Sequence, residues 1–262
     1  MKQRLKEWLR MPFAGDGAGL QCDMALLRDN LQAWQLGYPG AEPFPHIVID
    51  NFISERTLHR LLRDLPPADQ PMQRAVRTAR TEDGRMAQLN KRSYSDREVG
   101  PAVRHLLWEL NSGTFIDWLE ALTGIAGLLP DPSFNGAGVH VTDPGGLLRV
   151  HADYNKHPRY GLDRRVNLLL YLNEDWQEEY GGHLELWDRD MAQCRASVLP
   201  IARRCVIFNT TSDSFHGHPH PLACPSGVSR RSIALYYYTN GRPEAENNPR
   251  HATLWQDLPS EK

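Results

Sequence analysis

The second half of the chain consists of short runs rich in β-branched and aromatic residues, separated by turn-forming residues. Runs of this kind, bounded by Gly, Pro, Asn and Asp, predict short strands. The predicted strands are residues 138–142, 147–152, 166–172, 183–187, 204–208 and 230–239. The sequences between them include DPGG, NEDWQEEYGG and PHPLACPSG. Several short strands with such turns favour a mainly β fold, a double-stranded β-helix (jelly roll) supported by flanking N-terminal α-helices.

The first half of the chain carries helical patterns instead. Between residues 23 and 36, apolar residues recur at nearly the spacing of one helix face, and the Gly and Pro residues that follow end this helix. Further helices are predicted at residues 54–64, 101–111 and 114–123. Ser54 and Thr114 are expected to cap two of them, because a hydroxyl oxygen can accept a hydrogen bond from a free N–H of the first turn.

One strand and one long loop complete the first half. Residues 45–52 are rich in β-branched residues and are predicted to form the strand. Residues 67–100 are polar, rich in Arg and weakly periodic, which predicts a long loop that serves as a lid.

The helices and strands are expected to form one domain. The predicted parts are residues 1–132 as a mostly helical support and lid, 133–240 as the jelly-roll core and 241–262 as an irregular tail. No boundary is placed near residue 133, because Leu168, Leu170 and Leu172 would form an apolar strand face that needs a cover.

Composition excludes several classes of protein. Hydrophobic residues make up 40% of the 262 residues and charged residues 24%, which is typical of a globular protein. The net charge of -2 argues against binding to nucleic acid by bulk charge. No run approaches the ~18 apolar residues of a membrane span. The four cysteines form no CxxC pair, so neither a thiolate zinc site nor a disulfide framework is expected, and we predict a cytoplasmic protein.

Three short motifs follow one another along the predicted strands. His151 and Asp153 lie two residues apart, so that strand alternation places both on one face. His216 follows the strand CVIFN, and Arg230 and Ser232 share one face of the last strand. Two imidazoles and one carboxylate on one side of a metal form the facial triad of non-haem iron(II) oxygenases.

The arginine fits the same chemistry. A triad leaves room at the metal for a bidentate 2-oxo acid and for dioxygen. The far carboxylate of such an acid needs a cationic partner once it is buried. Arg230 can bind it with paired, charge-assisted hydrogen bonds, and Ser232 can donate another.

Each motif also has an ordinary structural interpretation. An HxD pair is common on protein surfaces. Arg-Arg-Ser can be a charged sequence that protects the edge of a sheet, and HGHPH can be a His-rich tract that binds metal ions without a defined site. His216, His218 and His220 have the same parity, so alternation cannot choose among them as the second imidazole. The order HxD, His, RxS, with suitable alternation on short strands, is what favours a metal site.

The stretch from residue 138 to residue 239 resembles the prolyl 4-hydroxylase-type 2-oxoglutarate/Fe(II) dioxygenases, and most of all the bacterial relatives of the ribosomal-protein prolyl hydroxylases. The motifs that carry the resemblance are HADYN, RRVNLLLYLNEDW, YGGHLELWD, CVIFNTTSDSFHGH and RRSIALYYYT. The strand PHIVIDNFIS also looks like the opening segment of that family.

The resemblance implies a role for each matching residue. The implied iron ligands are His151, Asp153 and His216, the last favoured over His218 by the sequence SFH and by its distance from Arg230. The implied cosubstrate residues are Arg230, with Ser232 as a second donor, Tyr171, Asn167 and Tyr236.

Two positions depart from the family pattern. His218 stands where an apolar residue is usual in the family. Thr142 stands where many relatives have a tyrosine, and the sequence therefore leaves some of the contacts with the cosubstrate unassigned. Related halogenases lack the carboxylate ligand, so Asp153 favours hydroxylation over halogenation.

The resemblance implies a hydroxylase that uses Fe(II), 2-oxoglutarate and O2, with L-ascorbate as a candidate reductant, and that releases succinate and CO2. The expected substrate is a prolyl residue in a protein or peptide. The alternatives are a small-molecule hydroxylase of the same mechanism and a catalytically silent metal-binding jelly roll. No nucleic-acid or membrane partner is expected, and the sequence does not predict the oligomeric state.

The segment after the HxD pair is a second predicted lid. Residues 154–165 follow Asp153 directly and contain Lys156, Arg164 and Arg165. These cations either bind an acidic or peptide-carbonyl substrate or are solvated loop charges.

Overall fold

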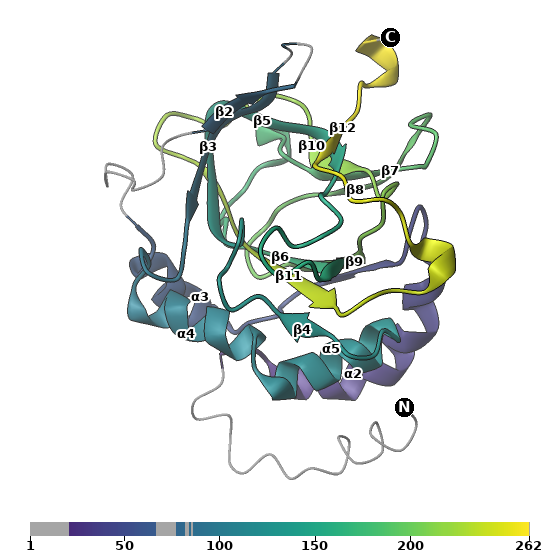
Figure 1. The fold of residues 1–262 in the computed structure, drawn as a ribbon. Helices are drawn as coiled ribbons and strands as arrows, with labels where there is room; N and C mark the ends of the chain where they lie inside the picture. Colours follow the sequence, from purple (N-terminus) through teal and green to yellow (C-terminus); the bar gives the residue numbers. More distant parts are fainter. Residues whose placement is uncertain (1–20, 67–76, 82–83, 85, 262) are drawn as a thin grey trace.

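The computed structural model describes residues 21–66, 77–81, 84 and 86–261 (Figure 1). The helices of this part of the chain are α2 (Met24–Gly37), α3 (Glu55–Arg63), α4 (Pro101–Leu110) and α5 (Gly113–Thr123). The strands of its first half are β1 (His46–Ile49), β2 (Arg77–Arg80), β3 (Met86–Tyr94) and β4 (Leu129–Pro130). The remaining strands are β5 (Gly138–Ala152), β6 (Asp163–Tyr171), β7 (Leu184–Trp187), β8 (Cys194–Val198), β9 (Cys205–Asn209), β10 (His216–His218), β11 (Arg230–Thr239) and β12 (Leu254–Trp255).

The strands form a nearly closed antiparallel barrel, which confirms the predicted mainly β, jelly-roll-like fold. The main path of the sheet runs β1-β9-β6-β11-β5-β10-β7-β8. Strand β5 joins the two halves of the barrel, because its first part pairs with β11 and its last part pairs with β10. The interior of the barrel is therefore lined by side chains from both halves.

The helices cover one side of the barrel, as the apolar face of β6 requires. Figure 1 shows them gathered beneath β6, β9 and β11. Leu168, Leu170 and Leu172 are buried in the same apolar cluster as the inward-facing residues of the helices, which confirms the prediction for that face. The phenol of Tyr237 in β11 donates a hydrogen bond of 2.9 Å to the carbonyl of Leu110 in α4, so the helical layer is also fixed to the sheet by a polar contact.

Trp118 of α5 is the largest side chain that is fully buried in this cluster, and its indole N–H donates to the carbonyl of Leu27 in α2 at 3.1 Å. Trp118→Ala is expected to lower the free energy of unfolding by about 3–5 kcal/mol, because it leaves a cavity. Trp108→Ala is the control, since Trp108 is 56% exposed and its loss is expected to cost at most about 0.5 kcal/mol. Urea denaturation of both variants measures the difference, and equal destabilisation would contradict this account of the helical layer.

Several predicted boundaries are wrong, and the largest error concerns residues 67–100. This segment is not a loop throughout, because residues 77–80 and 86–94 form β2 and β3, and β3 pairs with β5. Residues 67–76, 82–83 and 85 of the predicted lid lie outside the described residues.

Smaller corrections concern turns and caps. The sequence DPGG lies within β5 and not between two strands. The pairing of β3 with β5 shifts its register at this point, which shows that DPGG forms a bulge in β5. Helix α5 begins at Gly113, so its cap is Ser112 and not Thr114; the Ser112 hydroxyl accepts a hydrogen bond from the N–H of Phe115. Gly124 ends this helix in the left-handed conformation, as predicted. No strand was predicted at β4, β8, β10 or β12.

Among the helices that the structure describes, none is both long and apolar enough to cross a membrane.

Candidate functional site

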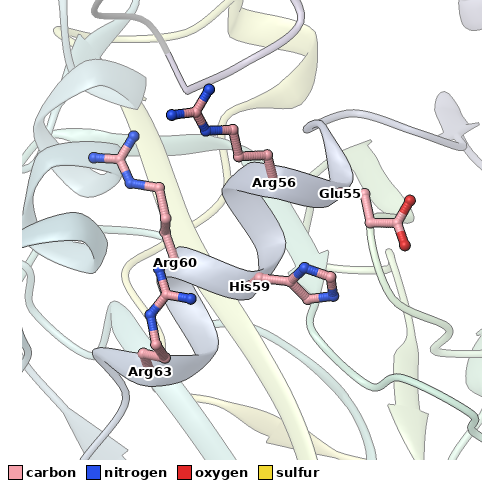
Figure 2. A pocket seen from close by; sticks show the side chains of 5 residues that line it. All are labelled: Glu55, Arg56, His59, Arg60 and Arg63. Atoms are coloured by element: carbon pink, nitrogen blue, oxygen red, sulfur yellow. The ribbon is translucent and has the colours of Figure 1, made fainter.

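The barrel encloses a cavity of about 210 Å³. Its walls come from β3, β5, β6, β7, β10, β11 and β12, and all eight residues proposed from the sequence are close to it or line it. A larger hollow of about 460 Å³ lies on the outside of α3, where Figure 2 shows Arg56, Arg60 and Arg63 on one side and His59 with Glu55 on the other. Because that hollow is lined by one exposed helix alone, the barrel cavity is the better candidate for a reaction site.

His151, Asp153 and His216 meet at one end of the cavity. Strand register explains the meeting, because His216 of β10 lies directly opposite His151 of β5 and Asp153 follows two residues later. One ligand atom of each residue lies within 4.8 Å of the others, and no other such group of three is present among the described residues. Oδ1 of Asp153 is 3.7 Å from Nε2 of His151, and Oδ2 is 3.5 Å from Nε2 of His216.

The backbone fixes the orientation of both imidazoles. Nδ1 of His151 lies 2.8 Å from the carbonyl of Arg149, and Nδ1 of His216 lies 2.9 Å from the carbonyl of Ser214. Since a carbonyl can only accept, Nδ1 is the nitrogen that carries the proton in the neutral form of each ring, and Nε2, on the side of Asp153, is then free to bind a metal. Burial, with His151 nearby, lowers the pKa of His216 to about 4, so this imidazole is neutral at pH 7.

Asp153 is held as a carboxylate. Burial alone would raise its pKa, but Arg164 and the two imidazoles outweigh burial and hold the pKa well below its usual range. A guanidinium nitrogen of Arg164 lies 2.9 Å from Oδ2, and the amide of Asn167 donates to the same oxygen at 2.8 Å. The ring of Tyr236 lies 3.6 Å from the Arg164 guanidinium carbon and supports the cation from its other side.

Arg164 is therefore neither a solvated loop charge nor free to bind a substrate, because it lies in β6 and is paired with Asp153. The other two cations that the sequence analysis singled out in this lid, Lys156 and Arg165, are also paired outside the cavity. Lys156 binds Asp163 at 2.8 Å, and Arg165 binds Glu246 at 3.1 Å.

Arg230 is buried in the cavity wall on β11, the strand next to β5, which carries His151. Its Nε donates to the carbonyl of Gly182 at 2.7 Å, and a terminal nitrogen donates to the phenol oxygen of Tyr171 at 3.3 Å. A Cβ at Gly182 would approach Arg230 to 3.0 Å, and φ there is +71°, so glycine suits this close contact. No carboxylate of the described residues pairs with Arg230. A buried cation without an anion is a binding site for one.

The structure distinguishes among the three histidines of HGHPH. His218 lines the cavity but lies opposite Leu148 rather than His151, and it is outside the group of three. His220 is exposed and lies 3.6 Å from Glu185. Only His216 meets His151 and Asp153.

Several cavity residues were missed by the sequence analysis. They are Gln88 and Lys91 on β3, His140 and Leu148 on β5, Leu169 on β6, Leu184 on β7, and Thr253 and Trp255 around β12. Trp255 pairs with His151 across β12 and β5, and their ring centroids are 4.9 Å apart. The short apolar run LW in a polar tail was the only signal for this strand.

Comparisons with known proteins agree with this geometry. Residues 137–238 match the family described as the 2OG-Fe(II) oxygenase superfamily. Prolyl 3-hydroxylase OGFOD1 of Mus musculus is 28% identical over 204 residues, which cover 75% of this chain and 33% of that protein. The chain thus spans about a third of the length of this relative.

One solved structure shows the same fold. A prolyl hydroxylase of Trichoplax adhaerens, solved with a peptide of the hypoxia inducible factor oxygen degradation domain, superposes with a TM-score of 0.53 at 17% identity. The match covers 81% of this chain and 91% of that one. A prolyl-4-hydroxylase of Pseudomonas putida gives a TM-score of 0.47 at 20% identity over 83% of this chain and 98% of its own.

Proposed function

Because this chain is a dioxygenase whose residues 137–238 form a 2OG-Fe(II) oxygenase domain of the prolyl 4-hydroxylase type, we propose that it hydroxylates a prolyl residue in a protein or peptide. One oxygen atom of O2 enters the C–H bond of the substrate, and the other enters succinate as 2-oxoglutarate loses CO2. The observation that carries the proposal is the convergence of two imidazoles and one carboxylate beside a buried arginine that pairs with no carboxylate of the described residues.

We propose that His151, Asp153 and His216 hold Fe(II). The donor set fits this ion, because each imidazole offers a free Nε2 and Asp153 remains ionised. Bound Fe(II) supplies the activation of O2 and the oxidative decarboxylation of the 2-oxo acid. Arg164 and Asn167 orient the carboxylate through its Oδ2, in the manner of the outer hydrogen bonds that hold metal ligands in place.

Arg230 is proposed to bind the distal carboxylate of 2-oxoglutarate. Its Nε is already used by Gly182, and its terminal nitrogens remain beside Tyr171 on the side that lines the cavity. Ser232 lies on the same face of β11 and lines the cavity as well. Asn167 and Tyr236 line the cavity and in addition contact the Asp153–Arg164 pair. The role of L-ascorbate stays a prediction.

The prolyl specificity rests on similarity to a relative named as a prolyl 3-hydroxylase. The test is incubation of the protein with Fe(II), 2-oxoglutarate and a library of proline-containing peptides, read by mass spectrometry. We expect a gain of one oxygen atom on a prolyl residue, with an equal amount of succinate. Matched peptides with Ala in place of Pro are the control.

Succinate without any peptide product, together with oxygen incorporation into a free amino acid or a natural product, would instead show a small-molecule hydroxylase. Absence of succinate under all conditions would contradict an active enzyme and favour a metal-binding jelly roll.

A further inference from the structure

Trp255 of β12 lies in the cavity wall beside the two proposed iron-binding imidazoles. It is the direct partner of His151 in the β12–β5 pair, and His151 is the direct partner of His216 in the β5–β10 pair. Because directly paired residues point to the same face of a sheet, the three rings form one row across three adjacent strands. The ring centroids of Trp255 and His151 are 4.9 Å apart, and those of His151 and His216 are 4.6 Å apart. The indole therefore lies at the metal-ligand end of the cavity, to which a hydroxylase has to bring its substrate.

The strand that carries this indole is fixed by contacts outside the cavity. Leu254 packs against an apolar cluster that includes Val150. The N–H of Gln256 donates a hydrogen bond of 2.9 Å to the carbonyl of Val150, and Asp257 pairs with Arg149 at 2.5 Å. The indole is thus held in position in the ligand-free protein, and a ligand that packs on it does not have to order the C-terminal segment first.

The surface of the indole is free for such a ligand. Trp255 is half-buried, and no guanidinium or ammonium group of the described residues lies over its ring. Tyr236 is the other tyrosine or tryptophan side chain that lines the described cavity. Its ring already lies 3.6 Å from the guanidinium carbon of Arg164, and its hydroxyl donates to the carbonyl of Gly136 at 3.1 Å. Of the two aromatic side chains, Trp255 is therefore the one that offers apolar surface beside the metal ligands.

The indole N–H of Trp255 is also free. The buried indoles of Trp118, Trp176 and Trp187 each donate to an oxygen of the chain, at 3.1, 3.0 and 2.9 Å. Trp255 makes no such hydrogen bond with any residue that the structure describes. An indole N–H can only donate, and it usually has a partner once it is buried. A ligand that covers this indole is therefore expected to bring an acceptor to it.

We propose that Trp255 binds the prolyl residue of the substrate, with its ring against the pyrrolidine and its N–H donating to a main-chain carbonyl of the peptide. The inference rests on the proposed function, since it assumes a peptide substrate. A pyrrolidine ring is apolar, and proline-rich segments adopt an extended conformation without internal hydrogen bonds, so their carbonyls are free to accept. Aromatic-lined grooves bind such segments in other proteins.

The proposed contact comes from outside the residues that match the family. The match ends at residue 238, whereas Trp255 belongs to the C-terminal segment. Trp255 is thus a specificity-determining residue that this segment adds to the barrel.

The experiment measures how strongly the protein prefers proline over alanine. The probes are the peptide that is hydroxylated in the library experiment and its matched peptide with Ala in place of the reactive Pro. Each is titrated calorimetrically into protein saturated with 2-oxoglutarate and with Mn(II), a redox-inactive stand-in for Fe(II). The ratio of the two dissociation constants gives the proline preference of each variant.

Two substitutions separate the ring contact from the hydrogen bond. Trp255→Leu is expected to weaken the Pro peptide by about 10- to 100-fold and the Ala peptide by only about 3- to 10-fold, so that most of the preference is lost. Trp255→Phe keeps an aromatic ring and lacks the N–H. We expect it to weaken both peptides by the same factor, about 3- to 10-fold, because both carry the main-chain carbonyl, and to retain the preference.

Two controls keep the result specific. Trp108→Leu removes an exposed indole on α4 outside the cavity and is expected to leave both dissociation constants unchanged. Titration of Mn(II) alone into each Trp255 variant is expected to match the wild type and shows that the metal site is folded. Saturation with Mn(II) in the peptide titrations prevents a change in metal affinity from being read as a loss of peptide binding.

Unchanged dissociation constants in Trp255→Leu would overturn the proposal, because the indole would then contact no peptide and would only support His151. Equal losses for the two peptides in this variant would overturn it as well, because the indole would not distinguish proline. Unchanged affinities in Trp255→Phe would contradict the hydrogen bond.

Failure of the proposed function gives a different result. A library in which no peptide is hydroxylated would overturn that function, and this inference with it, before any variant is made. A hydroxylated peptide that the wild type binds no better than its Ala match would overturn only the inference.

Discussion

Asp153→Ala is expected to abolish hydroxylation and to remove tight binding of the metal. Asp153 is the one carboxylate of the group of three, so the variant leaves two imidazoles and no anionic ligand to hold a divalent cation. Loss of the metal removes several kcal/mol of transition-state stabilisation, so we expect turnover to fall by about 1000-fold or more. Succinate release from 2-oxoglutarate with Fe(II) measures turnover, and titration with Mn(II) measures the metal site directly.

The same variant leaves Arg164 buried without its partner, which by itself can cost about 3–5 kcal/mol of stability. Asp153→Asn separates the two effects, because an amide oxygen can still accept from Arg164 while the negative charge is lost. We expect Asp153→Asn to be as inactive as Asp153→Ala and more stable to heat. Asp117→Ala, at an exposed position on α5, is the control and is expected to be fully active. Full activity of Asp153→Ala would contradict the metal assignment.

The sequence predicts the barrel and most of this site because both depend on alternation within single strands. His151 and Asp153 share a face of one strand, and Arg230 and Ser232 share a face of another, whatever the rest of the fold does. The choice between His216 and His218 could not be made in that way, since both have the same parity on β10. The register between β10 and β5 decides it, by placing His216 opposite His151 and His218 opposite Leu148.

The polar parts of the site were harder to predict for a different physical reason. Strand β3 shows little hydrophobic alternation, because its inward side chains Gln88 and Lys91 line a polar cavity rather than an apolar core. Its sequence therefore has the composition of a loop, although its backbone pairs with β5. Arg164 was misassigned for the same reason, since a buried arginine paired with a carboxylate is indistinguishable in sequence from a solvated one.

Trp255 shows a further limit. A strand of two residues carries no periodicity, and only its pairing with β5 places this side chain against His151. The contact places an aromatic ring against one side of the His151 imidazole, so the C-terminal segment borders the proposed metal site even though it lies beyond the residues that match the family.

Arg230→Met is expected to weaken 2-oxoglutarate binding by about 100-fold while leaving 2-oxovalerate binding nearly unchanged. The lost interaction is a charge-assisted contact with the distal carboxylate, which is worth about 1.5–3 kcal/mol for each hydrogen bond to a charged group. The wild type should therefore prefer 2-oxoglutarate strongly over 2-oxovalerate, and Arg230→Met should lose that preference. Titration of the Mn(II)-loaded protein with both ligands measures it.

Arg231→Met is the matched control, because Arg231 is the neighbour of Arg230 on β11 and alternation turns its side chain to the other face. It is expected to retain the preference of the wild type. Stability supplies an independent check. Arg230 is a buried cation with no carboxylate partner among the described residues, so replacing it by an apolar side chain of similar length is expected to leave the ligand-free protein as stable as the wild type, or more stable. A variant that loses stability but keeps its preference for 2-oxoglutarate would make Arg230 a structural residue and would require another cation to hold the distal carboxylate.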